Sequence, residues 1–165
     1  MIFSRLSIRT ALQAAVVAGM CVTGTLAQAQ SQDSAKCIVV DNSDPGFSAS
    51  SNWGTSPSAG DKYGPDYRYR ATEPVYDPAI WQLPRPVTGT FQISVWYTAG
   101  TNRTPAAAYI LPNGSTVVKN QQANGGQWNT LGTLSVTNST LPVTLSCYGP
   151  TGYIIIADAV RYCHQ

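Results

Sequence analysis

The chain has 165 residues, of which 43% are hydrophobic and only 11% are charged, and it contains 14 Gly, 11 Pro and 9 Tyr. This length suits one modest domain, and the low charge with abundant Gly, Ser, Thr, Asn and Tyr argues against a helical protein and against a disordered charged tail. Two of the 10 basic residues, Arg5 and Arg9, lie near the N-terminus, so eight basic and eight acidic residues remain from Gln30 onward. That balance lacks the basic face that nucleic-acid binding needs, and we expect no nucleic-acid partner.

Residues 1–29 have the three parts of a secretory signal peptide. Arg5 and Arg9 supply the positive start, residues 11–22 are apolar except at Gln13 and Gly19, and Ala27-Gln28-Ala29 is a small-x-small cleavage site. The apolar stretch and every later one are shorter than the ~20 residues of a transmembrane helix, so we expect no membrane span. We predict a secreted protein, extracellular or periplasmic, with a disordered lead-in at residues 30–36. An N-terminal core helix is the alternative for the leader.

From Cys37 onward the sequence predicts short strands separated by turn residues. Residues 37–41 are a β-branched run that stops at the dense turn signal of residues 42–46. Residues 47–67 are rich in Ser, Gly and Pro and contain Trp and Tyr, which is typical of a long surface loop with aromatic anchors. Two short strands are expected next, at residues 67–70 and 79–83.

The clearest strand covers residues 90–98, because apolar side chains occupy every second position from Phe91 to Tyr97. Trp96 then points to the other face, either outward or against a covering loop. Residues 106–111 and 116–119 predict a hairpin with Asn113-Gly114 at its tip. The last strands are expected at residues 130–136, 142–148 and 153–162, with a turn at 149–152 joining the final two as a hairpin.

This many short strands, with no convincing helical periodicity after the leader, predict an all-β fold. The expected architecture is an antiparallel β-sandwich of jelly-roll type, as a single domain over residues 37–163. A closed barrel is the alternative.

Signal cleavage removes Cys21 and leaves Cys37, Cys147 and Cys163, two of which can pair in an oxidising compartment. Because the ends of a compact domain often lie close together, we predict a disulfide between Cys37 and Cys163. Cys147 is then free and buried as a small hydrophobic residue. A disulfide between Cys37 and Cys147 is the alternative.

Several of these segments resemble a known family. Residues 40–47, Trp53 and residues 67–69 resemble the opening of the golvesin C-terminal-like domain, also described as the carbohydrate-binding-like domain of xanthan lyase. The resemblance implies a galactose-binding-like jelly roll, usually appended to secreted hydrolases, lyases or cell-wall enzymes, and a carbohydrate-binding role. The further matches, in chain order, are residues 95–97, 102–103, Gln121, residues 125–132 and residues 156–161.

The sequence holds few groups that could perform catalysis. Its one His, His164, is next to the C-terminus, where a triad histidine would not be held rigidly. The motifs Gly-x-Ser-x-Gly and His-Glu-x-x-His are absent, as are zinc-type Cys/His clusters. We therefore expect no enzyme, no cofactor and no metal. A glycosidase needs only two carboxyl groups, for which the candidates are Asp61, Asp66, Glu73 and Asp77.

Asp158 falls on the apolar face of the strand expected at residues 153–162. A carboxylate there must be hydrogen-bonded or paired, since burying it alone is costly. Arg70, Arg103 or the backbone of a turn could satisfy it. A structural calcium ion held with Asp41 and Asp44 is the alternative, and it would need further oxygen ligands.

Sugar rings stack their apolar faces on exposed Trp and Tyr rings, and polar side chains bind the sugar hydroxyls. We expect Trp81 and Trp128 to be core anchors. The candidate ligand-binding residues, all in or beside the loop at residues 47–67, are Trp53, Tyr63, Tyr67 and Arg68. For each aromatic ring, packing in the core or against a loop is the alternative.

The sequence therefore predicts a secreted, non-catalytic, carbohydrate-binding-like module that engages polysaccharide or cell-surface glycan. The alternatives are a structural or protein-interaction domain at the cell surface, and a small polysaccharide-degrading enzyme.

Overall fold

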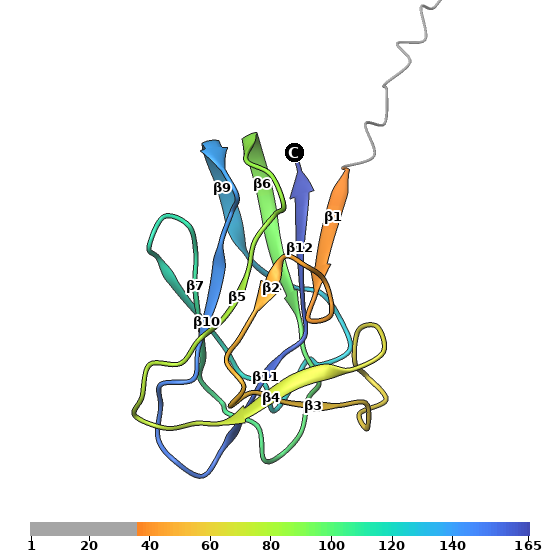
Figure 1. Cartoon of the computed structure of the whole chain (residues 1–165), viewed down its shortest axis with the longest axis vertical. Coiled ribbons are helices and arrows are strands. Elements are labelled where there is room, and N and C mark those ends of the chain that lie inside the picture. Colours follow the sequence, from red (N-terminus) through yellow and green to blue (C-terminus); the bar gives the residue numbers. More distant parts are fainter. Residues whose placement is uncertain (1–35) are drawn as a thin grey trace, which may run out of the picture. The chain divides into compact units, whose positions relative to one another are not determined.

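The computed structural model describes residues 36–165, and every regular element in that part of the chain is a β-strand (Figure 1). The all-β prediction is confirmed. Residues 36–165 contain no helix that could cross a membrane. The signal peptide expected at residues 1–29, and all but the last residue of the lead-in expected at residues 30–36, lie outside the described residues.

One sheet has four antiparallel strands in the order β1–β12–β6–β9. Period-two alternation places Phe91, Ile93 and Val95 in the hydrophobic core. The intervening side chains point to the other face, where Gln92 is half-buried and Ser94 is buried. Register shifts between β6 and β9 bend the sheet at two positions. The strand bounds are β1 (Cys37–Asp41), β12 (Ala159–His164), β6 (Val87–Trp96) and β9 (Asn129–Ser139).

The second sheet has five strands in the order β2–β5–β10–β7–β8. The predicted hairpin is confirmed, because β7 pairs with β8 and Gly114 at the tip has a φ of 82°, which glycine adopts without strain. The strand bounds are β2 (Phe47–Ser48), β5 (Ala79–Trp81), β10 (Val143–Ser146), β7 (Ala107–Ile110) and β8 (Thr116–Lys119).

A smaller sheet of three strands, in the order β11–β4–β3, lies across the lower end of the sandwich in Figure 1. It consists of β11 (Ile154–Ala157), β4 (Tyr67–Ala71) and β3 (Gly54–Ser56). The loop expected at residues 47–67 therefore contains two short strands, β2 and β3.

The single strand expected at residues 153–162 is wrong, because the chain leaves one sheet and enters another at Asp158. The final hairpin is also wrong, since β10 pairs with β5 and β7. The hairpin does not form because residues 72–73 make hydrogen bonds with the backbone on both sides of the turn at residues 149–152. Thr72 N–H donates to the Tyr153 carbonyl, and Gly149 N–H donates to the Glu73 carbonyl.

The sheets share one hydrophobic core, to which β6 contributes Ile93 and Val95, β5 contributes Trp81, and β10 contributes Leu145. Most successive strands lie in different sheets, so the chain passes repeatedly across the core. The fold is an antiparallel β-sandwich of jelly-roll type, as the sequence predicts.

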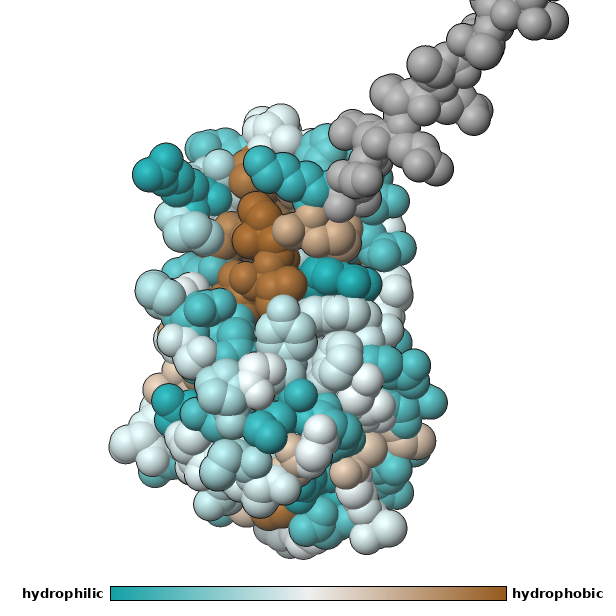
Figure 2. All heavy atoms as spheres, turned by 90° about the vertical axis from the view of Figure 1, so that its right-hand side faces the viewer, coloured by the Kyte–Doolittle hydropathy of each residue, from teal (hydrophilic) through white to brown (hydrophobic). Residues whose placement is uncertain are grey.

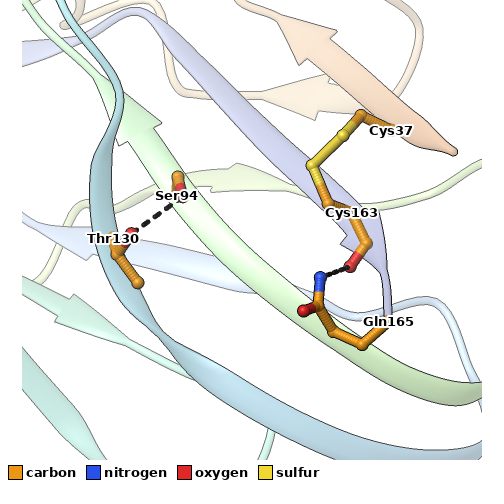
Figure 3. Close-up of a disulfide and its surroundings, with 5 residues drawn as sticks. All are labelled: Cys37, Ser94, Thr130, Cys163 and Gln165. Atoms are coloured by element: carbon orange, nitrogen blue, oxygen red, sulfur yellow. Dashed lines mark hydrogen bonds between the residues drawn. A yellow bond between two sulfur atoms is a disulfide. The ribbon is translucent and has the colours of Figure 1, made fainter. Parts of the chain in front are cut away.

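The predicted disulfide between Cys37 and Cys163 is confirmed (Figure 3). The two cysteines are directly opposite each other on β1 and β12, and 126 residues separate them in sequence. The bond therefore ties the first strand of the domain to the last. Cys147 is free and buried, as expected, and its thiol donates to the Val75 carbonyl.

Candidate ligand-binding site

The four residues expected to bind ligand do not share one site. Trp53 is only 2% exposed and Tyr67 only 4%, so the expectation that both rings face solvent is wrong. Both rings belong to the hydrophobic core, where large aromatic side chains gain most from burial. The Trp53 indole N–H donates to the Asp77 carbonyl at 3.1 Å, which ties the loop before β3 to the loop before β5.

Arg68 lies in β4 between Tyr67 and Tyr69, so its side chain points to the opposite face of the strand. It lines a shallow hollow with Asp44 and Phe47, beside β2. This hollow is distinct from the one that Tyr67 reaches.

Tyr63 is half-buried in an aromatic cluster with Trp96 and Trp128, and the ring centroids lie 5.3 to 5.7 Å apart. The Trp96 indole N–H donates to the Asp61 carbonyl at 2.8 Å, so Trp96 packs against a covering loop, one of its two expected orientations. The Arg161 guanidinium lies 4.6 Å from the centre of the Trp128 ring. Arg161 belongs to β12, so the cluster lies over the four-stranded sheet.

The expectation that Trp128 is a core anchor is wrong, because it is half-buried in this cluster. The turn at Gly125-Gly126 explains its position: Gly125 and Gly126 both lie against Asp61, in the covering loop. Trp81 is a core anchor, as expected, and its indole N–H donates to the Asp158 carbonyl at 3.2 Å.

A hollow of about 370 Å³ lies where the three-stranded sheet meets the turn before β7. Neighbouring β-strands place its side chains: Ser56 is opposite Tyr67 in the register of β3 and β4, and Gly54 is opposite Tyr69. We call it the tyrosine hollow. Its lining residues are Thr55, Ser56, Ser58, Tyr67, Tyr69, Asn102, Arg103 and Ile154.

The turn at residues 100–104 is fixed to the edge of β11 by backbone hydrogen bonds. Ile154 N–H donates to the Asn102 carbonyl, and Thr104 N–H donates to the Ile154 carbonyl, both at 2.9 Å. The backbone of Arg103 is therefore held against Ile154, and its side chain lies in the hollow.

Tyr69 is the exposed aromatic residue of the hollow, with 39% of its surface accessible. A β-carbon added at Gly54 would lie 2.6 Å from Cζ of Tyr69, so the ring occupies the space that the missing side chain leaves. The ring centroid of Tyr67 lies 6.4 Å away. The Tyr69 ring therefore packs against Gly54 and remains accessible to solvent.

The polar side of the hollow carries a positive charge. The Arg103 guanidinium donates from Nη1 to Asn102 Oδ1 at 2.9 Å, and its Nε is buried with no hydrogen-bond partner. The hydroxyls of Tyr67 and Ser58 share a hydrogen bond of 3.2 Å. Burial alone would raise the pKa of Tyr67, but hydrogen bonds with Ser56, Ser58 and Arg103, together with the charge of Arg103, lower it below the ordinary value.

The four carboxylates considered for glycoside hydrolysis each have a partner that holds a loop. Asp61 Oδ2 accepts from Ala99 N–H at 2.9 Å, and Asp66 Oδ1 accepts from the Asn42 amide at 2.5 Å. Glu73 and Asp77 both pair with Arg70. None of the four lines the tyrosine hollow.

Asp158 is 1% exposed and accepts from the backbone N–H of Tyr63 at 3.0 Å. Of the partners expected for Asp158, which were Arg70, Arg103 and the backbone of a turn, the structure has the backbone. Loss of hydration raises the pKa of Asp158 to about 8, and the charges of Asp41, Asp61 and Asp66 add to the effect. Within residues 36–165, no three His, Cys, Asp or Glu side chains are grouped so as to hold a metal ion.

Of the eight residues that line the hollow, only Tyr67 was among the sequence-based candidates, and those that were missed include Tyr69, Asn102 and Arg103. Alternation along residues 67–70 places Tyr69 on the same face as Tyr67, which is a signal that the sequence contained. The approach of Asn102 and Arg103 to β11 depends on long-range strand pairing, and no local pattern indicates it.

Among protein families, the model described as the golvesin C-terminal domain matches residues 38–164. This range covers nearly all of the described residues. No curated protein matches the chain.

Among solved structures, the chain is similar to a xanthan lyase from Paenibacillus, with 29% sequence identity and a TM-score of 0.71. The match covers 79% of this chain and 13% of the xanthan lyase chain. The chain therefore corresponds to a small part of that enzyme.

Two family 35 carbohydrate-binding modules share the fold at lower identity. The module from Cellvibrio japonicus Abf62 has 12% identity and a TM-score of 0.58, and the match covers 77% of this chain and 92% of the module. The module from Clostridium thermocellum has 15% identity and a TM-score of 0.57, over 78% of this chain and 98% of the module.

Proposed function

The chain belongs to the golvesin C-terminal domain family, and from that premise we propose that it is a non-catalytic carbohydrate-binding module whose ligand occupies the tyrosine hollow. One observation carries the proposal: the exposed ring of Tyr69 lies on Gly54 beside hydroxyl, amide and guanidinium groups. The ligand class is polysaccharide or cell-surface glycan. The names of the similar structures support this class, since they include a xanthan lyase and two carbohydrate-binding modules.

The chemistry of the hollow matches the two faces of a sugar. The C–H face of a sugar ring packs on an aromatic ring, and the hydroxyls at its edge exchange hydrogen bonds with polar side chains. Tyr69 offers the first surface, and Ser56, Ser58 and Asn102 offer the second. Such binding needs no proton transfer, which suits a chain with a single His.

We test the proposal by electrophoresis of the purified protein through gels that contain plant, bacterial or fungal polysaccharides. At least one polysaccharide is expected to retard the protein, and Tyr69→Ala is expected to abolish the retardation. Tyr76→Ala is the matched control, because Tyr76 is 74% exposed and lies outside the hollow. Absence of retardation in every gel, or equal loss in both variants, would contradict the proposal.

We also propose export, with a signal peptide at residues 1–29, a lead-in at 30–36 and the domain at 37–163. The disulfide between Cys37 and Cys163 supports an oxidising compartment, extracellular or periplasmic. Sequencing the N-terminus of protein recovered from the medium or periplasm is expected to begin at Gln30. A mature protein that begins at Met1 would refute the assignment.

A second candidate function is contact with a protein partner, favoured by an apolar hollow of about 640 Å³ that includes Ile38, Val87 and Phe91. Figure 2 shows a band of strongly hydrophobic residues on the upper half of the side where β1 lies. This candidate predicts that Ile38→Ser abolishes partner binding in pull-down experiments and leaves glycan retardation unchanged.

A further inference from the structure

We propose that the tyrosine hollow selects sugars that carry a carboxylate, and that Arg103 binds this carboxylate. The inference rests on the proposed function and narrows its ligand class from glycan to acidic glycan. It depends on the partners that Arg103 has and lacks.

Arg103 has no acidic partner among the described residues. Within residues 36–165, both ion pairs belong to Arg70, which contacts Glu73 and Asp77. The side chain of Arg103 instead contacts neutral groups: it donates to Asn102 Oδ1 and forms a hydrogen bond with the Tyr67 hydroxyl, and its Nε is buried without a partner. A guanidinium that is partly removed from water and lacks a counter-ion is unfavourable until an anion binds.

Other arginines also have a buried Nε without a hydrogen bond, but their surroundings differ. The guanidinium of Arg161 lies over the Trp128 ring, and this cation–π contact stabilises its positive charge. Arg68 shares its hollow with Asp44. The tyrosine hollow has no acidic lining residue, so the anion that Arg103 lacks has to come from outside the chain.

The geometry of an acidic sugar fits the two halves of the hollow. In a uronic acid the carboxylate projects from the edge of the ring, so the ring face can pack on Tyr69 while the carboxylate contacts Arg103 at the polar side. The planar guanidinium forms two parallel hydrogen bonds with a carboxylate, a geometry that ammonium lacks. A carboxylate is therefore favoured over a hydroxyl at this position.

Overall charge does not supply the attraction. From Gln30 onward the chain has equal numbers of basic and acidic residues, so no general positive field draws an acidic polymer to the surface. Removal of a distant cation is then expected to have no effect on binding, whereas removal of the Arg103 cation is expected to have a large one.

The test is titration calorimetry of the purified protein with polygalacturonate, alginate and hyaluronate, and with the same polymers after chemical reduction of their carboxyl groups. Reduction converts each uronic acid to a neutral sugar and leaves the linkages intact. At least one acidic polymer is expected to bind about tenfold or more tightly than its reduced form, the effect of a hydrogen bond to a charged group.

Arg103→Gln is expected to remove that preference. Arg103→Lys, which retains the charge and loses the planar fork, is expected to reduce it. Arg85→Gln is the matched control, because Arg85 is exposed in the loop before β6 and lies outside the hollow. Urea unfolding of each variant checks the fold, and Arg103→Lys remains informative if Arg103→Gln fails to fold.

The outcomes separate the two proposals. Equal affinity for an acidic polymer and its reduced form, or binding to neutral polysaccharides alone, overturns the carboxylate inference and leaves glycan binding intact. An equal loss of the preference for acidic polymer in Arg103→Gln and Arg85→Gln overturns the carboxylate inference as well. Dextran sulfate that binds as tightly as the acidic polymer also overturns it, since the site would then respond to negative charge and not to a carboxylate. Absence of binding to every polymer, neutral or acidic, refutes the proposed function itself.

Discussion

Tyr69 keeps its ring on the surface of the hollow because Gly54, its partner in the neighbouring strand, has no side chain. The next aromatic residue on the same face, Tyr67, is buried in the core. Two residues with the same side chain, on the same face of one short strand, therefore have different roles. The difference comes from what β3 places opposite each of them.

Gly54→Ala is expected to weaken glycan binding about tenfold or more, because the new methyl group would displace the Tyr69 ring from its support. Gly54 has no positive φ, so alanine strains the backbone little there. Gel retardation measures the effect. Gly60→Ala is the control, since a side chain at Gly60 meets no neighbour within 4 Å; an unchanged affinity in Gly54→Ala would contradict the role assigned to Tyr69.

Asp158 makes stability depend on pH. The pKa of its carboxyl rises from 3.8 to about 8 on folding, so between these values the folded protein holds a proton that the unfolded chain has lost. The contribution of Asp158 to stability is therefore largest at low pH and falls as the pH rises towards 8. Burial raises the pKa of Asp41 too, which acts in the same direction.

Asp158→Asn is expected to flatten this pH dependence, because the amide oxygen can still accept the Tyr63 N–H and does not titrate. Urea unfolding at about pH 5 and about pH 8 measures the change for both proteins. The wild-type protein is expected to lose more free energy of unfolding over this interval than the variant. Parallel losses in the two proteins would show that Asp158 titrates normally.

Whether a single side chain is buried could be predicted from the sequence where the local pattern determines it, and could not be predicted where long-range packing determines it. The burial of Asp158 followed from the apolar residues around it, and the structure confirms it. The Ser-rich sequence around Trp53 suggested an exposed ring, but the ring lies in the hydrophobic core beside β3 and β4. Only the folded chain shows which loop aromatics have core neighbours.

At the scale of elements, the bond between β1 and β12 closes nearly the whole domain into one loop of the chain. Replacing both Cys37 and Cys163 with alanine is expected to lower the free energy of unfolding by about 4–5 kcal/mol, the loop-closure entropy for a loop longer than about 100 residues. Urea unfolding measures the loss. Cys147→Ala keeps the disulfide and is the control; an equally stable double variant would contradict the expectation.

Gln121 joins two sheets from a position that is fully buried. Its amide donates to the Tyr109 hydroxyl of β7 and to the Ile156 carbonyl of β11, and its oxygen accepts from the Ile156 N–H. Because the edge of β11 also holds the turn of Arg103, Gln121 supports the tyrosine hollow from inside.

Gln121→Met is expected to cost about 2–4 kcal/mol, since it fills a similar volume but leaves the polar groups of Ile156 and Tyr109 without partners. Thermal or urea unfolding measures the loss. Gln122→Met at the exposed neighbouring position is the control. A cost of less than about 1 kcal/mol, or equal costs in the two variants, would show that water or a shifted backbone replaces these bonds.

Most strands could be predicted from β-branched runs and turn residues, and β1 and β8 have the predicted bounds. The break at Asp158 and the pairing of β10 could not be predicted, because they depend on contacts between segments more than 60 residues apart, such as that between Thr72 and Tyr153. Alternation predicts faces within a strand, but it does not predict which sheet the strand joins.

At the scale of the whole molecule, composition and family resemblance together predicted the fold. Few charges, many turn residues and the resemblance of segments within residues 40–161 to the golvesin family indicated a β-sandwich, and the family match over residues 38–164 agrees with them. The position of the hollow was not predictable in this way, because fold alone does not determine where a ligand binds. It follows from the contact of the 100–104 turn with β11 and from the single glycine under Tyr69.

Mapping the bound glycan by NMR tests glycan binding at the tyrosine hollow most directly. Titration of the ¹⁵N-labelled protein with the polysaccharide fragment that binds best is expected to shift amide signals at residues 54–58, 67–69 and 102–103. Signals of the apolar hollow beside Ile38 and of the aromatic cluster at Trp128 are expected to stay in place. Shifts confined to either of those regions, with none at Tyr69 and Arg103, would contradict the account.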